Sequence, residues 1–193
     1  PDVALAGVAA FAPASDLTTL IDRVQHTPVG RIMTSFVLQA YSRTYPDVRF
    51  DDYASGWVAG LLARDMARRC MAGPKTLFSV AEALLLGGSI FDSPPGTGAL
   101  GERLMQNTPD RPLPQPLLIA QGLSDDLVLP DIQAHFVKRR CAAGQALEFH
   151  RYAGRDHLSL VAADSPLTGD LVRWTRDRIA GRPVPSGCRD STD

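Results

Sequence analysis

The sequence predicts an α/β fold, in which a parallel sheet is flanked by helices and a long helical segment interrupts the sheet. Three observations support this prediction. Short apolar segments occupy residues 5–12, 116–122 and 147–153, helical patterns follow the last two, and a helical stretch separates the first two. Strands that alternate with helices are typical of parallel sheets, because each crossover returns the chain to the same end of the sheet.

The three expected strands differ in their patterns. Residues 5–12 are almost continuously apolar and stop before Pro13, as in a strand that is buried on both faces. Residues 116–122 repeat that pattern and end at a glycine. Residues 147–153 alternate apolar and polar side chains, so we expect a more exposed strand near the sheet edge.

Two helices are expected beside these strands. After Pro130, Asp131 can cap a helix that Gly144 ends. A second helix is expected over residues 166–180, with Trp174 on its apolar side. The order strand, helix, strand, helix therefore supports a parallel arrangement.

The stretch between the first two strands is helical in pattern and carries no strand signal. Loops rich in proline and glycine interrupt it. Helices are expected at Leu17–Val24, Val29–Tyr41, Tyr53–Met71 and Thr76–Leu86. We therefore expect three parts: residues 1–15 in the sheet, 16–114 as a helical insertion, and 115–193 as the rest of the sheet. Two roles are open for the insertion: a cap over an active site, or a helical subdomain without a gating role.

Composition excludes several classes of protein. The chain is 45% hydrophobic and 21% charged, as in a globular domain. A net charge of −1 provides no basic field, so nucleic acid is not an expected partner. No apolar run approaches the roughly 20 residues of a membrane span, and no signal peptide pattern opens these residues. No metal and no cofactor are expected.

Three cysteines, Cys70, Cys141 and Cys188, lack metal-ligand spacing. They are either reduced thiols, or Cys141 pairs with Cys188 while Cys70 pairs with a cysteine outside this sequence. The position of Cys188 in a tail rich in proline and glycine favours the second interpretation. A disulfide closing such a loop would contribute roughly 3–4 kcal/mol in the chain-entropy model.

An acid and a histidine follow the last two expected strands. Asp125 lies three residues after Gly122, and His157 lies in the loop after residue 153. Catalytic groups in open α/β sheets gather at the carboxyl ends of strands. A carboxylate there can orient a histidine that acts as general base. Asp126 is a direct competitor for the acid role and is expected to sit deeper in the turn, whereas His26, His135 and His150 are expected to be structural.

No matching nucleophile motif occurs in these 193 residues. The G-x-S-x-G elbow that presents an attacking serine is absent. The nearest strings, at residues 87–90 and 122–125, lack the flanking glycines and the strand-to-helix setting. Since serine, acid and histidine follow one another in that order in such folds, we expect the serine in an N-terminal half that these residues do not contain.

Several segments together resemble a known family. They are Gln121–Pro130, Arg139–Gly144, Tyr152–His157, Trp174 and Gly181–Cys188. These segments are similar to the C-terminal half of the secretory lipase family, which includes the fungal lipase A type and bacterial relatives. The resemblance implies the C-terminal part of an α/β-hydrolase fold with a large helical lid. It also implies an extracellular location and the triad roles for Asp125 and His157. One disulfide would join Cys141 to Cys188, and Cys70 would pair with the N-terminal half.

The expected function is that of a carboxylic ester hydrolase, an esterase or lipase. The apolar stretches Ile32–Leu38 and Leu84–Leu86 suit an acyl substrate, or alternatively only pack the cap. A serine peptidase of the same fold and a non-catalytic binding module are the alternatives. One expected partner is an ester or lipid substrate. The other is the N-terminal half, because the strand at residues 5–12 would otherwise leave an apolar edge unpaired.

Overall fold

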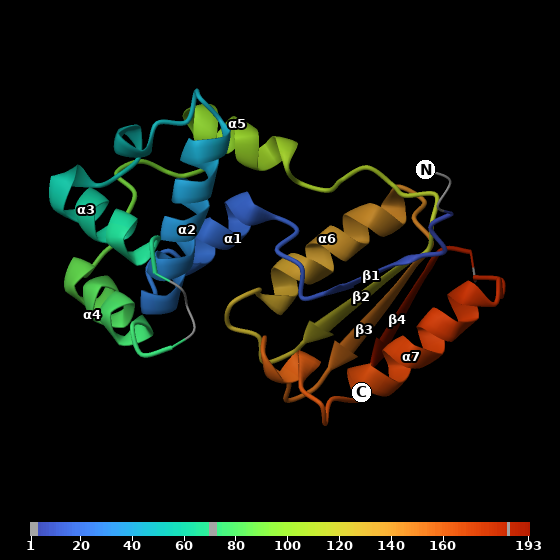
Figure 1. Ribbon diagram of the computed structural model, residues 1–193. Coiled ribbons are helices and arrows are strands. Elements are labelled where there is room, and N and C mark those ends of the chain that lie inside the picture. Colours follow the sequence, from blue (N-terminus) through green and yellow to red (C-terminus); the bar gives the residue numbers. More distant parts are fainter. Residues whose placement is uncertain (1–3, 70–72, 185) are drawn as a thin grey trace. The chain divides into compact units, whose positions relative to one another are not determined.

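The computed structural model describes residues 4–69, 73–184 and 186–193 (Figure 1). The chain divides into two compact units. One consists of the segment that ends at Asp16 together with Pro109–Asp193, and the other is Leu17–Thr108. The expected disulfide of Cys70 concerns a residue that lies outside the described part of the chain.

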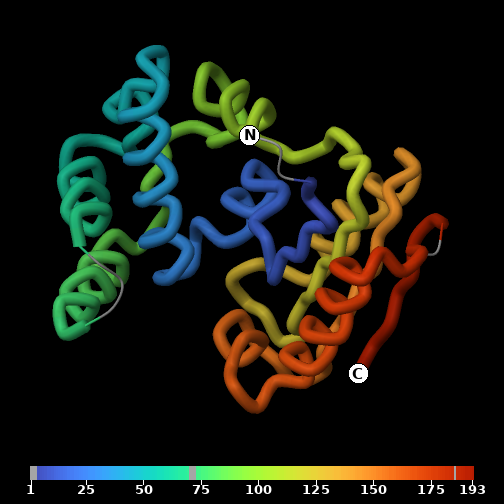
Figure 2. Tube along the Cα trace, turned by 45° about the vertical axis from the view of Figure 1, so that its right-hand side comes forward, coloured from blue at the N-terminus to red at the C-terminus, as the bar shows by residue number. Residues whose placement is uncertain are grey.

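The first unit is built on a sheet of four parallel strands. In spatial order they are β1 (Val8–Phe11), β2 (Leu117–Gly122), β3 (Leu147–Tyr152) and β4 (Cys188–Thr192). Strand β1 lies beside β2 although the whole helical unit separates them in sequence, as Figures 1 and 2 show. This confirms the predicted fold class, a mixed α/β fold with a parallel sheet flanked by helices.

Helix α6 (Pro130–Ala142) covers one face of this sheet, and α7 (Pro166–Ile179) covers the other (Figure 1). Apolar side chains from α6, β2 and β3 form one buried cluster: Leu117, Ile119, Phe136, Val137, Leu147 and Phe149. All six residues of β2 are buried, which explains its continuous apolar run.

The N-terminus of α6 differs from the expectation. Asp131 lies in the first turn of α6, whereas the N-cap position belongs to Leu129, so the expected cap was wrong by two residues.

The contact between α7 and the sheet is polar as well as apolar. The indole Nε1 of Trp174 donates to Glu148 Oε1 at 3.0 Å, and the Tyr152 hydroxyl donates to Asp170 Oδ2 at 2.8 Å. Burial, together with this hydrogen bond to Asp170, raises the pKa of Tyr152 well above its usual range. The phenol therefore stays protonated and keeps α7 tied to the end of β3.

Strand β4 was not expected from the sequence. Residues 188–192 are polar and exposed throughout, so they carry no hydrophobic period. They pair in parallel with β3, so β4 is the outer strand and β3 lies next to it, near the sheet edge as its alternating pattern predicted. Because β4 buries little side-chain surface, contacts with distant segments must hold it in place.

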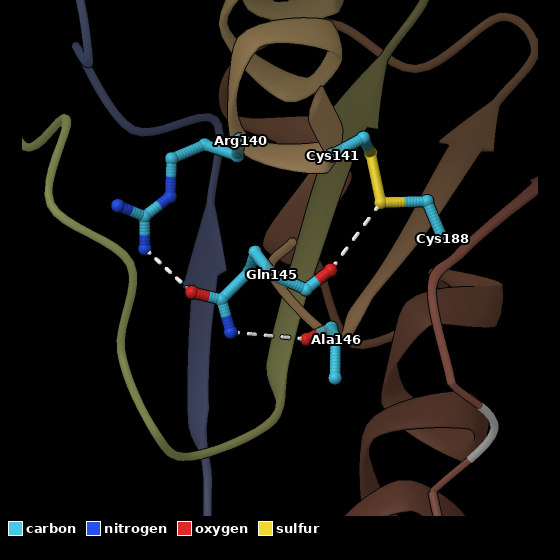
Figure 3. Close-up of a disulfide and its surroundings, with 5 residues drawn as sticks. All are labelled: Arg140, Cys141, Gln145, Ala146 and Cys188. Carbon is cyan, nitrogen blue, oxygen red and sulfur yellow. Dashed lines mark hydrogen bonds between the residues drawn. A yellow bond between two sulfur atoms is a disulfide. The ribbon is translucent and has the colours of Figure 1, made fainter. Parts of the chain in front are cut away.

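Two such connections are a disulfide and an ion pair. Cys141 at the end of α6 is bonded to Cys188 at the start of β4, the pairing that the family resemblance implies (Figure 3). The guanidinium of Arg151 in β3 donates to the Asp190 carboxylate in β4 at 2.9 Å. The exposed strand is thereby attached to both a helix and its neighbouring strand.

The second unit consists of helices around their own core. They are α1 (Leu17–Val24), α2 (Pro28–Thr44), the short 3-10 helix η1 (Phe50–Asp52), α3 (Gly56–Met66), α4 (Thr76–Leu86) and α5 (Gly98–Gln106). Thr27 caps α2, where its side chain accepts from the Gly30 N–H. The Arg31 guanidinium donates to the carbonyl of Ala83 at 2.7 Å and so ties α2 to α4. Among the described residues, no helix is both long and apolar enough to cross a membrane.

Two sequence expectations fail in this unit. Helix α3 begins at Gly56, after the expected start at Tyr53, because Ala54 forms an isolated antiparallel bridge with Phe91. Helix α5 was not expected, since glycine at two of its nine positions weakens the helical pattern. Its start is fixed from outside the helix, where the Leu100 N–H donates to the Tyr53 hydroxyl at 2.8 Å.

The disulfide predicts how β4 responds to reduction. Replacing both Cys141 and Cys188 by serine removes a cross-link that spans 47 residues, which should lower the free energy of unfolding by about 4 kcal/mol. Denaturant unfolding measures this loss, and hydrogen exchange should show faster exchange of the β4 amides. Reduced wild-type protein is the control and should match the variant. Equal protection of β4 with and without the disulfide would contradict this account.

Candidate active site

Two loops meet at the carboxyl ends of β2 and β3. The strands pair in phase, from Leu117 opposite Leu147 to Gly122 opposite Tyr152, so both end at the same level. Asp125 is the third residue after β2, and His157 is the fifth after β3. The sheet edge therefore brings together two side chains that are 32 residues apart in sequence.

The carboxylate of Asp125 and the imidazole of His157 are hydrogen-bonded. Nδ1 of His157 lies 2.9 Å from Oδ2 of Asp125. Because a carboxylate only accepts, Nδ1 carries the proton in this pair and Nε2 is left to face other groups. The Asp125 side chain is fully buried, whereas the His157 side chain is 33% exposed. In this geometry the buried Asp125 orients the imidazole of His157, while the imidazole itself is accessible from solvent.

Asp125 is held by further donors. Its Oδ1 accepts from the N–H groups of Leu127 at 2.9 Å and Val128 at 2.8 Å. Its Oδ2 also accepts from Nε2 of Gln121 at 3.2 Å. Burying a carboxylate is costly unless its oxygens accept hydrogen bonds, and these donors offset that cost. The expectation that Asp126 sits deeper in the turn was wrong: Asp126 is exposed and Asp125 is the buried residue.

The loops that carry Asp125 and His157 are joined through their backbones. The Ser124 N–H donates to the Arg155 carbonyl at 2.9 Å, and the Leu123 N–H donates to the Tyr152 carbonyl at 2.9 Å. Gly122 permits this approach, because a Cβ at that position would overlap the Arg155 carbonyl. The sequence analysis used Gly122 as the end of a strand and as the reference point for Asp125, and did not predict this close approach.

Asp156 shapes the turn around His157. Its Oδ1 accepts from the N–H of Leu158 at 3.0 Å, and from both the N–H and the hydroxyl of Ser159 at 2.7 Å each. These bonds, first of all those from Ser159, hold the pKa of Asp156 below its usual range. The chain then forms one 3-10 turn at Ser159–Val161. The pattern Asp-x-x-Ser is a signal that could have identified this turn from sequence.

The other candidates from the sequence lie elsewhere in the fold. His135 is exposed on α6, and His150 lies mid-strand in β3, 3.6 Å from Glu148 and 3.9 Å from Asp170. The Ser89 hydroxyl is hydrogen-bonded to Gln25 within the helical unit. Over residues 4–69, 73–184 and 186–193, no cluster of three or more histidine, cysteine or acidic side chains is placed to hold a metal ion.

The close approach at Gly122 can be tested by a substitution that adds one methyl group. Gly122→Ala places that group against the Arg155 carbonyl, so the free energy of unfolding should fall by about 1–3 kcal/mol. Urea unfolding measures the change. Gly169→Ala in α7 is the matched control, because its Cβ would meet no atom within 4 Å and alanine favours a helix. Equal stability of both variants would contradict the assigned role of Gly122.

Comparison with known proteins identifies relatives of this chain. The family model described as secretory lipase matches residues 1–187. The secreted triacylglycerol lipase LIP2 of Malassezia globosa is 25% identical over 185 residues, which is 91% of this chain and 40% of that protein. The secreted triacylglycerol lipase LIP3 of the same fungus is 33% identical over 93 residues, which is 48% of this chain and 20% of that protein.

A bacterial relative carries a different name. The protein named "Probable inactive lipase MT1628" of Mycobacterium tuberculosis is 24% identical over 197 residues, which is 95% of this chain and 41% of that protein. This chain thus spans less than half the length of each of these relatives. The match of the family model to nearly the whole chain confirms the family resemblance: the chain belongs to the secretory lipase family.

Proposed function

We propose that this chain is part of an extracellular carboxylic ester hydrolase, an esterase or lipase, with a Ser-His-Asp triad. The observation that carries the proposal is the 2.9 Å hydrogen bond between the buried Asp125 carboxylate and the partly exposed His157 imidazole. Its position at the carboxyl edge of a parallel sheet and the membership in the secretory lipase family add support. Two relatives named secreted lipases support the extracellular location.

In the proposed reaction, His157 acts through Nε2. This nitrogen takes the proton of a serine hydroxyl as the serine oxygen attacks the ester carbonyl carbon. Asp125 stabilises the imidazolium that forms and keeps Nδ1 protonated. His157 then returns the proton to the departing alcohol, which leaves an acyl-serine. Water attacks this ester in a second round with the same base, and the acid is released.

The serine and the oxyanion donors are proposed to lie in an N-terminal half outside these 193 residues. The absence of a G-x-S-x-G elbow from the sequence supports this. So does the edge of the sheet, because within the described residues β1 pairs with β2 alone. Strand β1 (Val-Ala-Ala-Phe) carries no charge that would protect a free edge. We therefore propose that the half with the serine adds a strand beside β1.

The proposed substrate is an ester with an apolar acyl group. Of the stretches named from the sequence, Ile32 and Leu38 belong to the core of the helical unit and cannot meet a substrate. Leu84 and Leu85 are exposed on α4. Further large apolar side chains are exposed on α3 and α4: Trp57, Val58, Leu61, Leu77 and Phe78. This unit thus has apolar surface for a cap, the role that we propose for it.

One observation favours a second candidate. A relative that aligns with 95% of this chain is named a probable inactive lipase. The second candidate is therefore a non-catalytic member of the family that retains Asp125 and His157 without turnover.

Labelling by a fluorophosphonate separates the two candidates. The full-length polypeptide that carries this segment should be labelled on one serine N-terminal to it, as identified by peptide mass spectrometry. It should also hydrolyse p-nitrophenyl esters and leave peptide p-nitroanilides intact, which sets it apart from a peptidase. Absence of both label and ester turnover in folded full-length protein would favour the non-catalytic candidate.

The acid role can be assigned by neighbouring substitutions. Asp125→Asn should lower kcat for ester hydrolysis by about 10⁴-fold, because the amide no longer holds the required tautomer of His157. His157→Ala should cause a loss of similar size, since the general base is gone. Asp126→Asn is the matched control and should retain wild-type rates. A large loss in Asp126→Asn with an active Asp125→Asn would reverse the assignment.

A further inference from the structure

Gln121 is a buried amide directly behind the Asp125 carboxylate. It is the fifth residue of β2 and its side chain is inaccessible to solvent. Its Nε2 lies 3.2 Å from Asp125 Oδ2, 3.1 Å from the Gly122 carbonyl and 3.0 Å from the Val128 carbonyl. The amide group thus faces three acceptors around the turn that carries Asp125.

The other end of this amide is unsatisfied. Oε1 of Gln121 is buried and accepts no hydrogen bond from the described residues. A buried acceptor without a donor is unfavourable, and an apolar side chain would avoid that penalty. Rotating the amide by half a turn would place Oε1 against three acceptor oxygens. The orientation of the side chain is therefore set by what Nε2 donates.

We propose that Gln121 is a positioning residue of the triad, which holds Asp125 for His157. This inference rests on the proposed hydrolase function. Oδ2 of Asp125 accepts from Gln121 and from His157 at once, while two backbone N–H groups fix Oδ1. The carboxylate is thus clamped on both oxygens.

The positioning role of Gln121 requires an uncharged donor, which the amide provides. A cation beside Asp125 would cancel the negative charge that stabilises the imidazolium of His157. A second carboxylate would add to that charge or compete for its proton. A neutral donor fixes the position of Asp125 and leaves its full charge to His157.

Two variants of Gln121 test the proposal in the full-length enzyme. Gln121→Leu removes the donor, and Gln121→Glu replaces it by an acidic oxygen of almost the same shape. In both, kcat should fall roughly ten- to a hundred-fold while KM changes little, because the side chain is buried behind Asp125. In Gln121→Glu, the acid limb of the pH profile of kcat/KM should also move to higher pH. An added negative charge stabilises the imidazolium, so more alkaline conditions are needed to free the base.

Gln145 provides a matched control. It is equally buried but precedes β3, at the opposite end of the strands from Asp125. Its Oε1 accepts a hydrogen bond from Arg140 (Figure 3), with a donor–acceptor distance of 2.7 Å, so Gln145→Glu would face a cation. This variant can lower stability, but its pH profile should match the wild type.

The outcomes separate this inference from the proposed function. Inactive wild-type enzyme would overturn the hydrolase proposal itself. Active wild-type enzyme, with His157→Ala inactive and both Gln121 variants unchanged in kcat and pH profile, would overturn only the role of Gln121. The role of Gln121 would also be overturned if the acid limb of the kcat/KM pH profile shifted no further in Gln121→Glu than in Gln145→Glu. Failure of both Gln121 variants to fold would assign the residue to the fold and also contradict the inference.

Discussion

The in-phase parallel pairing of β2 with β3 is the constraint on which the candidate site depends. Residues that pair in register from Leu117–Leu147 to Gly122–Tyr152 make both strands end together. The loops that follow then bond through the Ser124 N–H and the Arg155 carbonyl. A slip of one residue would turn the apolar side chains of β3 away from α6 and separate Asp125 from His157. Strand packing and the geometry of the acid–histidine pair are thus set by the same register.

A second constraint is the cost of burying a carboxylate. Asp125 has no exposed side-chain surface, and its ionised form requires donors on both oxygens. The loop supplies two of them from its own backbone, and Gln121 and His157 supply the others. Because most of these donors belong to the same short segment as the acid, the carboxylate is placed locally. His157 is then brought to it by the neighbouring strand.

The sequence predicted those elements whose side chains carry a clear pattern. The continuous apolar run of β2 indicated a buried strand, and the spacing after Gly122 and after residue 153 identified Asp125 and His157 as candidates. The catalytic roles of these two residues stay predictions. Strand β4 was missed because its five residues are polar and exposed, and its pairing depends on contacts from distant segments. The hydrogen bonds of Gln121 and the close approach of Gly122 to Arg155 were missed for another reason, because a pattern of apolar residues does not encode such contacts.

The two edges of the sheet differ in a way that supports the proposal of a partner strand. Strand β4 carries Arg189 and Asp190, is exposed along its whole length, and is tied down by a disulfide. Charges and polar side chains of this kind discourage further pairing at an edge. Strand β1 has the opposite character, with four uncharged residues that are each partly buried. An edge strand without charged side chains tends to pair with a further strand, because the N–H and C=O groups along its free side are unpaired. An additional strand would therefore pair with β1 and not with β4. This is the edge at which we propose that the half with the serine joins the sheet.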